Sequence, residues 1–289
     1  MTVQKRDLPA CLFVAVSTRM PTLSVLKDAI QSLGGAISSK WKKTDFLTAL
    51  VALPGGPVKL EQLASVKLQT EDLGKIVEKA LCNVLCIPYN GAYKYGPPPP
   101  ELESRLSALK PHLPADLVHT AAAGARYDYT SISDPSKHIS VKTTKGGSKI
   151  APSFLGQPQP AAFCERIGIP FVSVPALKCT IQENIATLVL PAMATHTFDA
   201  PIVYYNARTQ CLQIISLRTP IDWSAYEYSW SCSHADWNNS ASVKIRTPTG
   251  LTCLAEFQFH SASRTNMANR WCFESVLSLF REHFAIIDL

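Results

Sequence analysis

Asp128 and Lys142 are the residues of this sequence whose types and spacing are best suited to chemistry on a phosphate ester. Asp128 lies in an alternating segment, 125–132, and Lys142 lies in a β-branched segment, 138–144. Both patterns indicate β-strands. Between them, Ser-Asp-Pro-Ser at 133–136 has the composition of a tight turn. The resulting hairpin would bring a carboxylate and an ammonium to one end. The carboxylate could hold a hard divalent cation, and the lysine could orient water and offset charge on the phosphate.

These residues resemble the motif of the PD-(D/E)XK nuclease superfamily, and most closely that of its type II restriction endonucleases. The family pattern is an acid on one strand and acid-x-Lys on the next, with a glutamate on an upstream helix. Asp128 corresponds to the first acid and Lys142 to the lysine. Two positions depart from the pattern, because Tyr127 replaces a proline and Ser140 replaces the second acid. Serine there is similar to a subgroup that keeps Ser-x-Lys and draws the missing carboxylate from a later helix.

The resemblance covers roughly residues 70–165. It implies an α/β (α+β) fold in which a central mixed sheet is flanked by helices, and it implies a Mg²⁺ site. By the geometry of the family, Asp128 and the carbonyl of Val141 would be metal ligands. Lys142 would orient the attacking water, and Ser140 would mark the position of the missing acid.

Two glutamates are candidates for that missing carboxylate. Glu165 lies downstream at a predicted helix start, where the Ser-x-Lys subgroup has its acid, and we expect it to be a metal ligand. Glu78 lies on a predicted amphipathic helix at 70–86, one turn away from the small residues Gly74 and Cys82. We expect Glu78 to support the site. The alternatives are a solvated Glu78 on the helix surface and an ion pair of Glu165 with the arginine that follows it.

The elements around this motif suggest three regions, at 1–69, 70–169 and 170–289. The first holds N-terminal helical elements, the second the nuclease core, and the third a β-rich C-terminal part of the same domain. Helices are predicted at 21–33, 46–53 and 101–109, with shorter apolar elements at 11–16 and 60–66. Strands are predicted at 171–174, 186–190, 201–205, 212–217, 242–246 and 253–260, followed by a closing helix at 271–284.

The β-rich region contains residues that we expect to read DNA. In the last predicted strand, Glu256, Gln258 and His260 share one face. The predicted DNA contacts are Lys145, Lys149, Gln258, His260 and Arg264. A segment at 222–239 contains three tryptophans and two tyrosines, which either stack on bases or form the core of a β domain.

Length and composition are those of a globular protein, with 289 residues, 46% hydrophobic and 17% charged. The net charge of +6 is compatible with a polyanionic partner. The nine cysteines form no CxxC pair, which argues against a zinc ribbon and favours reduced thiols. No apolar run reaches transmembrane length, and the N-terminus lacks a signal-peptide cleavage pattern. We therefore expect a cytoplasmic protein without membrane association.

Together these features predict a Mg²⁺-dependent endonuclease that cleaves double-stranded DNA at a specific short site. Cleavage of both strands at a symmetric site favours a homodimer, and a companion methyltransferase acting on the same site would protect the host. Two alternatives stay open. One is a non-catalytic DNA- or protein-binding module in which the hairpin is structural, and the other is a repair or recombination nuclease. The aromatic and polar C-terminal half favours a sequence reader.

Overall fold

The computed structural model describes residues 23–58, 70–121, 125–146, 149–260 and 267–289. The apolar segments predicted at 11–16 and 60–66, and the predicted DNA contact Arg264, lie outside these residues. The described chain forms two compact units. One contains residues up to 72 together with 93–98, and the other contains 73–92 together with 99–289.

The first unit contains a helix pair, α1 (Leu23–Ser32) and α2 (Lys43–Ala52). α1 ends before Gly34, whose φ of 77° is a left-handed conformation that glycine adopts without strain. The side chains buried between the helices are Leu26, Ala29, Ile30, Phe46 and Leu50. The helices predicted at 21–33 and 46–53 are thus confirmed over the described residues, and α2 begins earlier than predicted.

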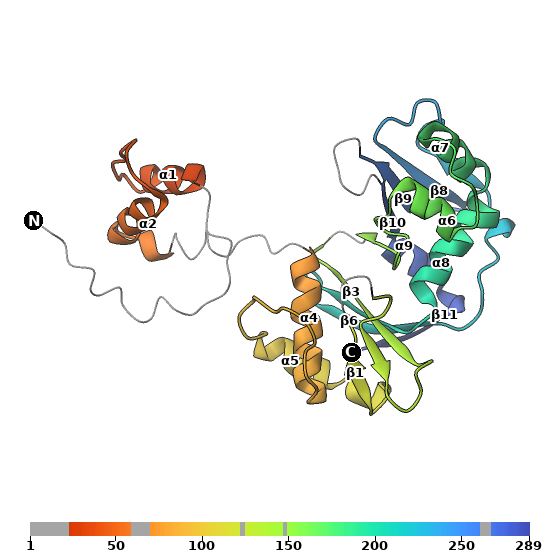
Figure 1. The fold of residues 1–289 in the computed structure, drawn as a ribbon, viewed down its shortest axis with the longest axis horizontal. Helices are drawn as coiled ribbons and strands as arrows, with labels where there is room; N and C mark the ends of the chain where they lie inside the picture. Colours follow the sequence, from red (N-terminus) through yellow and green to blue (C-terminus); the bar gives the residue numbers. More distant parts are fainter. Residues whose placement is uncertain (1–22, 59–69, 122–124, 147–148, 261–266) are drawn as a thin grey trace, which may run out of the picture. The chain divides into compact units, whose positions relative to one another are not determined.

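A six-stranded mixed sheet is the frame of the second unit (Figure 1). In spatial order its strands are β1 (Leu117–His119), β2 (Tyr129–Ser131), β3 (His138–Thr144), β5 (Ile202–Asn206), β6 (Cys211–Leu217) and β11 (Phe284–Asp288). β3 and β5 run parallel, and the other neighbouring pairs are antiparallel. A parallel pair needs a crossover connection, which residues 145–201 provide.

Two helices cover one face of this sheet, α4 (Thr70–Leu85) and α5 (Pro100–Ser107) (Figure 1). A 3₁₀ turn, Lys110–His112, follows α5. The apolar stripe of α4, with Val77 and Leu81, packs in one core with Val141 of β3. The helices predicted at 70–86 and 101–109 are confirmed within two residues at their ends.

The other face packs against a larger core, in which Ile202 and Tyr204 of β5 take part. The helices of this core are α6 (Pro160–Arg166), α7 (Val174–Glu183), a π-helical turn (Ile185–Val189), α8 (Leu190–Phe198) and α9 (Phe273–Leu279). It also contains a second, antiparallel sheet, in the order β4 (Lys149–Ile150), β10 (Met267–Cys272), β9 (Gly250–Phe259), β8 (Ser240–Thr247) and β7 (Tyr228–Trp230). Short 3₁₀ turns lie at Trp223–Ala225 and Arg281–His283. The second unit is therefore a mixed α/β structure.

Two of the strands predicted after residue 170 are wrong. Residues 171–173 are irregular, and the Ser173 hydroxyl accepts a hydrogen bond from the N–H of Ala176 at 3.2 Å, which caps α7. Residues 186–190 belong to the π-helical turn and the start of α8. Buried apolar side chains recur every four residues in this segment, which is the spacing of a helix. A short β-branched stretch taken alone does not show this spacing and was therefore interpreted as a strand. The recurring side chains are Leu177, Ile181, Ile185, Val189 and Met193.

The closing helix predicted at 271–284 is also wrong over much of its length. Trp271 is fully buried and pairs with Ala255, so it belongs to β10 rather than to a helix. α9 is only seven residues long, and β11 begins at Phe284. The strands predicted at 201–205, 212–217, 242–246 and 253–260 are confirmed with shifted ends.

Candidate active site

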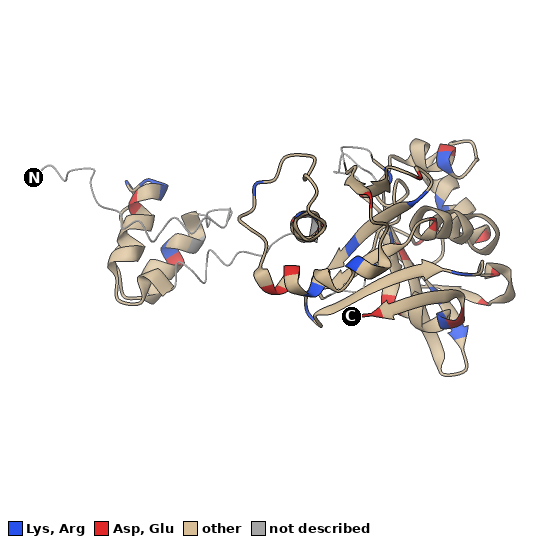
Figure 2. Ribbon diagram, turned by 90° about the horizontal axis from the view of Figure 1, so that it is seen from below, with Lys and Arg blue, Asp and Glu red and all other residues tan. Residues whose placement is uncertain are grey.

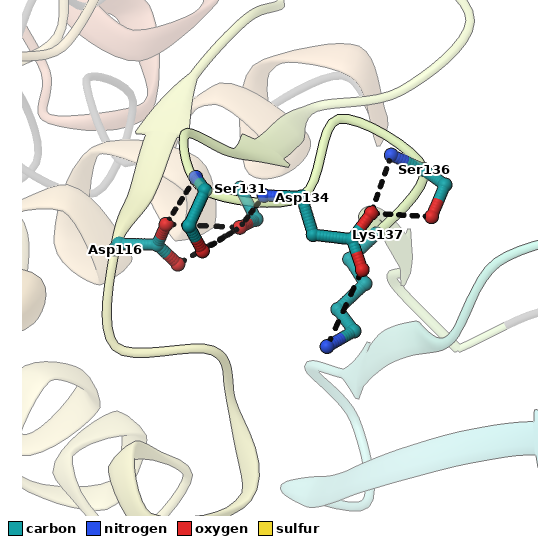
Figure 3. Close-up of polar contacts among 6 residues, drawn as sticks. Asp116, Ser131, Asp134, Ser136 and Lys137 are labelled. Atoms are coloured by element: carbon teal, nitrogen blue, oxygen red, sulfur yellow. Dashed lines mark hydrogen bonds and ion pairs between the residues drawn. The ribbon is translucent and has the colours of Figure 1, made fainter.

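The hairpin formed by β2 and β3 is closed by a polar turn (Figure 3). Asp116, just before β1, accepts hydrogen bonds from the Ser131 hydroxyl at 2.9 Å and from the backbone N–H of Ser133 at 2.5 Å. Asp134 accepts one from the backbone N–H of Ser136 at 3.1 Å. These bonds hold the turn that was predicted at 133–136. The first strand of the hairpin is shorter than the predicted 125–132, because regular pairing starts only at residue 129.

Asp128 lies directly before β2, with its carboxylate directed at β3. Its backbone N–H donates to the carbonyl of Ile139 at 3.1 Å, and its Oδ2 accepts from the N–H of Val141 at 2.6 Å. Burial raises the pKa of Asp128 to about 6, and the negative charge of Glu78 adds to the rise. The hydrogen bond from Val141 and the charge of Lys142 oppose it. The carboxylate charge is therefore only partly compensated.

Lys142 belongs to the same site. Its Nζ lies 3.3 Å from the Ser153 hydroxyl, in hydrogen-bonding distance. Burial lowers the pKa of Lys142, whereas the negative charges of Asp128, Asp199 and Glu78 raise it. The carboxylate and the ammonium that the sequence placed on one hairpin thus interact electrostatically.

Glu78 reaches this site from α4, and its side chain is only 13% exposed. A Cβ added at Gly74 would lie 3.7 Å from Oγ1 of Thr143 and 3.8 Å from Oε1 of Glu78. One turn further along, Sγ of Cys82 lies 3.6 Å from the hydroxyl of Tyr129, which also donates to the Glu78 carbonyl at 2.6 Å. Small residues before and after Glu78 therefore let α4 approach β2 and β3 closely.

The oxygen donors at this site fit a hard divalent cation. Because the charge of Glu78 raises the pKa of Asp128, a cation held by both carboxylates would relieve their repulsion. The N–H of Val141 points at Asp128, and the carbonyl of a strand residue points to the same edge as its N–H. No three His, Cys, Asp or Glu side chains of the described residues form a ligand group. The side-chain oxygen donors of the site are therefore the carboxylates of Asp128 and Glu78, and the ligand role expected for the Val141 carbonyl stays a prediction.

Ser140, which replaces the second acid of the motif, and Glu165, the expected source of the missing carboxylate, lie in different places. Ser140 is buried, and its N–H donates to the carbonyl of Pro201 at 3.0 Å. Glu165 is exposed on α6. Among the described residues, the carboxylates whose charge shifts the pKa of Asp128 or Lys142 do not include Glu165. The charge of Glu78 thus acts on the hairpin, and the role expected for Glu165 as a metal ligand stays a prediction.

Two further residues of the site had no signal in the sequence. The Nε2 atom of His119 lies 3.4 Å from Oε2 of Glu78, and its strand, β1, is too short to predict. Asp199 follows α8, where it accepts a hydrogen bond from the Tyr127 hydroxyl and pairs with Nη2 of Arg126 at 2.7 Å. Only the parallel pairing of β3 with β5 brings Asp199 near Lys142, and that pairing cannot be read from local patterns.

The predicted DNA contacts lie along the second sheet and after the hairpin. Lys149 on β4 forms an ion pair with Glu256 on β9. The Gln258 amide donates to Glu256, and Nε2 of His260 lies 3.1 Å from Oε1 of Gln258. Lys145 is exposed. The alternation predicted for this strand is confirmed, because Phe257 and Phe259 are buried on its other face. Basic and acidic residues are interspersed over the described chain (Figure 2).

The aromatic segment at 222–239 contributes to the core. Trp223 and Trp237 are 4% and 1% exposed, and both belong to the larger core. Trp230 packs against Trp237 with ring centroids 5.8 Å apart. Buried indoles cannot stack on bases, so the core interpretation holds for Trp223 and Trp237.

The fold and this site together define a class: a mixed α/β protein in which two carboxylates and a lysine interact electrostatically beside a hairpin. The chain is 35% identical over 227 residues to the type II restriction enzyme CviAII of Paramecium bursaria Chlorella virus 1. The matched part is 77% of this chain and 64% of that enzyme, so the chain spans somewhat less than two thirds of its curated relative. No family model matches the chain, and no solved structure matches it. Among the described residues, no helix has the length and apolar character needed to cross a bilayer.

Proposed function

We propose that this chain is a Mg²⁺-dependent endonuclease with a PD-(D/E)XK core, which cleaves double-stranded DNA at a specific short site. The observation that carries the proposal is the electrostatic coupling of three groups at the β2–β3 hairpin. The charge of Glu78, on α4, acts on both Asp128 and Lys142, and Oδ2 of Asp128 is held by the N–H of Val141 at 2.6 Å. The 35% identity to a protein named as a type II restriction enzyme supports it. A structural hairpin alone would not require a partly uncompensated carboxylate that interacts electrostatically with a half-buried lysine.

The carboxylates of Asp128 and Glu78, together with the carbonyl of Val141, hold the cation in this proposal. When bound, Mg²⁺ supplies a Lewis acid for the scissile phosphate. The N–H of Val141 fixes Asp128 Oδ2 at 2.6 Å, so this oxygen is oriented before any ligand arrives. Glu165 remains a second candidate for the acid that Ser140 lacks.

Lys142 orients the water that attacks the phosphorus atom. Its ammonium also offsets the negative charge that builds on the phosphate oxygens as the new P–O bond forms and the P–O bond to the leaving group breaks. The hydrogen bond to the Ser153 hydroxyl directs Nζ. Burial lowers the pKa of Lys142 overall, and the negative charges of the surrounding carboxylates limit this fall and so favour the ammonium form.

The second sheet supplies DNA contacts in this proposal. Gln258 and His260 carry amide and imidazole groups that can pair with base edges. Lys145 and Lys149 contact phosphates, and Arg264 contacts base edges. Two copies of the chain, related by a two-fold axis, would cleave the two strands of a symmetric site. A methyltransferase acting on the same site and a location in the cytoplasm belong to the same proposal.

The test is to incubate the purified protein with plasmid DNA in Mg²⁺ and, in parallel, in EDTA. We expect discrete fragments with Mg²⁺ and intact plasmid with EDTA. A smear would indicate a nuclease without sequence specificity, as in repair or recombination. DNA binding without cleavage in any divalent cation would favour the non-catalytic module and contradict the proposal.

A further inference from the structure

His119 is a buried histidine whose two ring nitrogens have different partners. Its side chain is 0% exposed. Nδ1 accepts the backbone N–H of Asn90 at 2.9 Å, and Nε2 faces Oε2 of Glu78 at 3.4 Å. A backbone amide can only donate, so Nδ1 carries no proton in this contact. The proton of the neutral ring is therefore on Nε2, where it is donated to Glu78.

The imidazole is also held in place by its aromatic neighbours. Tyr89 stacks on it, with ring centroids 4.4 Å apart and an interplanar angle of 26°. Tyr129 meets it edge-on at 5.1 Å and also donates to the Glu78 backbone carbonyl at 2.6 Å. The ring can neither turn over nor move away without breaking the bond from Asn90. His119 is thus a fixed donor directed at one oxygen of Glu78.

The two oxygens of Glu78 then have separate environments. Oε2 is engaged by His119, whereas Oε1 lies beside Gly74, a position that also faces Oγ1 of Thr143 on β3. A flexible glutamate on a helix would sample several rotamers, and holding one of them lowers the entropy lost when a ligand binds. In metal sites, partners of this kind orient the ligating carboxylate.

We infer that His119 is a positioning residue that holds the Glu78 carboxylate in its cation-binding orientation. This inference rests on the proposed function, because it assigns Glu78 to the cation. His119 itself touches neither the cation nor the DNA. Its contribution is to the affinity for the divalent cation, through the orientation of a single side chain.

The test compares two substitutions that differ in which ring nitrogen they imitate. His119→Asn can still accept the N–H of Asn90 but has no group at the Nε2 position. His119→Gln extends an amide N–H toward Glu78. The first readout is binding of Mn²⁺ alone, followed by the paramagnetic resonance of the free ion, without DNA. The second is the Mg²⁺ concentration that gives half-maximal plasmid cleavage.

We expect His119→Asn to weaken Mn²⁺ binding by about 10–100-fold and to raise the Mg²⁺ midpoint by a similar factor. His119→Gln should recover most of the affinity. Melting in EDTA identifies any variant that fails to fold. A double-mutant cycle separates positioning from general damage, because His119→Asn should add no further loss of Mn²⁺ affinity to Glu78→Gln.

Each other outcome overturns the inference in a recognisable way. If His119→Asn binds Mn²⁺ and cleaves like the unmodified chain, or if its loss persists in full on top of Glu78→Gln, His119 does not act through Glu78, and the proposed function stands. If Glu78→Gln itself binds Mn²⁺ normally, the assignment of Glu78 fails and the inference fails with it. If the unmodified chain binds no Mn²⁺, the metal-dependent function fails too.

Discussion

Asp128 is harder to ionise than an ordinary aspartate, and this affects stability as well as chemistry. Burial and the charge of Glu78 raise its pKa to about 6, whereas the value in an unfolded chain is about 3.9. Because the folded-state pKa is raised, this group stabilises the fold most below about pH 4. That contribution is lost as the pH rises through about 6. The metal-free protein therefore retains an unfavourable charge at neutral pH.

The substitution Asp128→Asn should abolish cleavage and raise the melting temperature in EDTA at pH 7.5 by several degrees. The amide keeps an oxygen for the N–H of Val141 and removes the buried charge. A gain of 1 kcal/mol corresponds to about 2–4 °C in a domain of this size. The gain should disappear below pH 4. Thermal melts across pH 3–8 and a plasmid assay check this.

Asp134→Asn is the matched control for that substitution. Hydrogen bonds from Ser136 lower the pKa of Asp134, so its neutralisation should not raise the melting temperature at neutral pH. A melting temperature of Asp128→Asn equal to or below that of the unmodified chain at pH 7.5 would contradict the electrostatic account. Residual cleavage near the normal rate would contradict the site assignment.

The source of the second carboxylate can be decided by comparing Glu78→Gln with Glu165→Gln. The charge of Glu78 acts on both Asp128 and Lys142, while Glu165 is exposed on α6. We expect Glu78→Gln to reduce cleavage by at least about 100-fold, because a hard cation needs charged oxygen ligands. Glu165→Gln should retain cleavage within a few-fold. Rates at saturating Mg²⁺ measure both, and the reverse order would assign the ligand to Glu165.

The elements that a short stretch of sequence defines by its own pattern could be predicted. α4 shows its apolar stripe over sixteen residues, and the β2–β3 hairpin has its turn chemistry within six. Those two elements carry Glu78, Asp128 and Lys142, so the centre of the site could be assembled from the sequence. α7 and α8 were not predicted, because their apolar spacing shows only over a window longer than the short segments that indicated strands. His119 and Asp199 could not be found, since only sheet topology brings them close.

Asp116 should stabilise the hairpin turn down to low pH. Hydrogen bonds from Ser133 and Ser131 lower the pKa of Asp116 to about 2. A lowered folded-state pKa means that the stabilisation is fully present above about pH 4 and is lost as the pH falls through about 2. Asp116→Asn should therefore lower the melting temperature at pH 7, and the difference should shrink towards pH 2. Melting curves across this range test it; a difference independent of pH would show that the charge is not involved.

The face of β9 that carries Gln258 should discriminate between DNA sequences. Alanine at Gln258 or His260 should weaken binding to the cognate site more than to random DNA, since a good base contact is worth roughly 1–3 kcal/mol. Lys145→Ala is the comparison, because loss of a phosphate contact weakens both DNAs alike and reduces the salt dependence. Gel shifts at several salt concentrations measure this. Equal losses on both DNAs for Gln258→Ala would mark it as a phosphate contact.

At the scale of the whole molecule, the proposed homodimer predicts a specific product. Mixed dimers of the unmodified chain and Asp128→Asn contain a single working site. They should nick one strand of a supercoiled plasmid and leave an open circle, whereas the unmodified dimer gives linear DNA. Sedimentation with and without DNA measures the association state. If linear DNA instead forms in proportion to the amount of unmodified chain and nicked circles do not accumulate, one chain cleaves both strands.

The two strands that neighbour β3 should pair with it at different times during refolding. β2 reaches it through a short turn, and hairpins of this kind close in about 1–10 μs. β5 reaches it only after the crossover of residues 145–201 has been ordered, and such long-range parallel pairing is slow. Asp128 and Val141 can therefore meet early, while Ser153 and Asp199 join Lys142 late. Refolding should pass through a stage that has the hairpin but not yet the complete site.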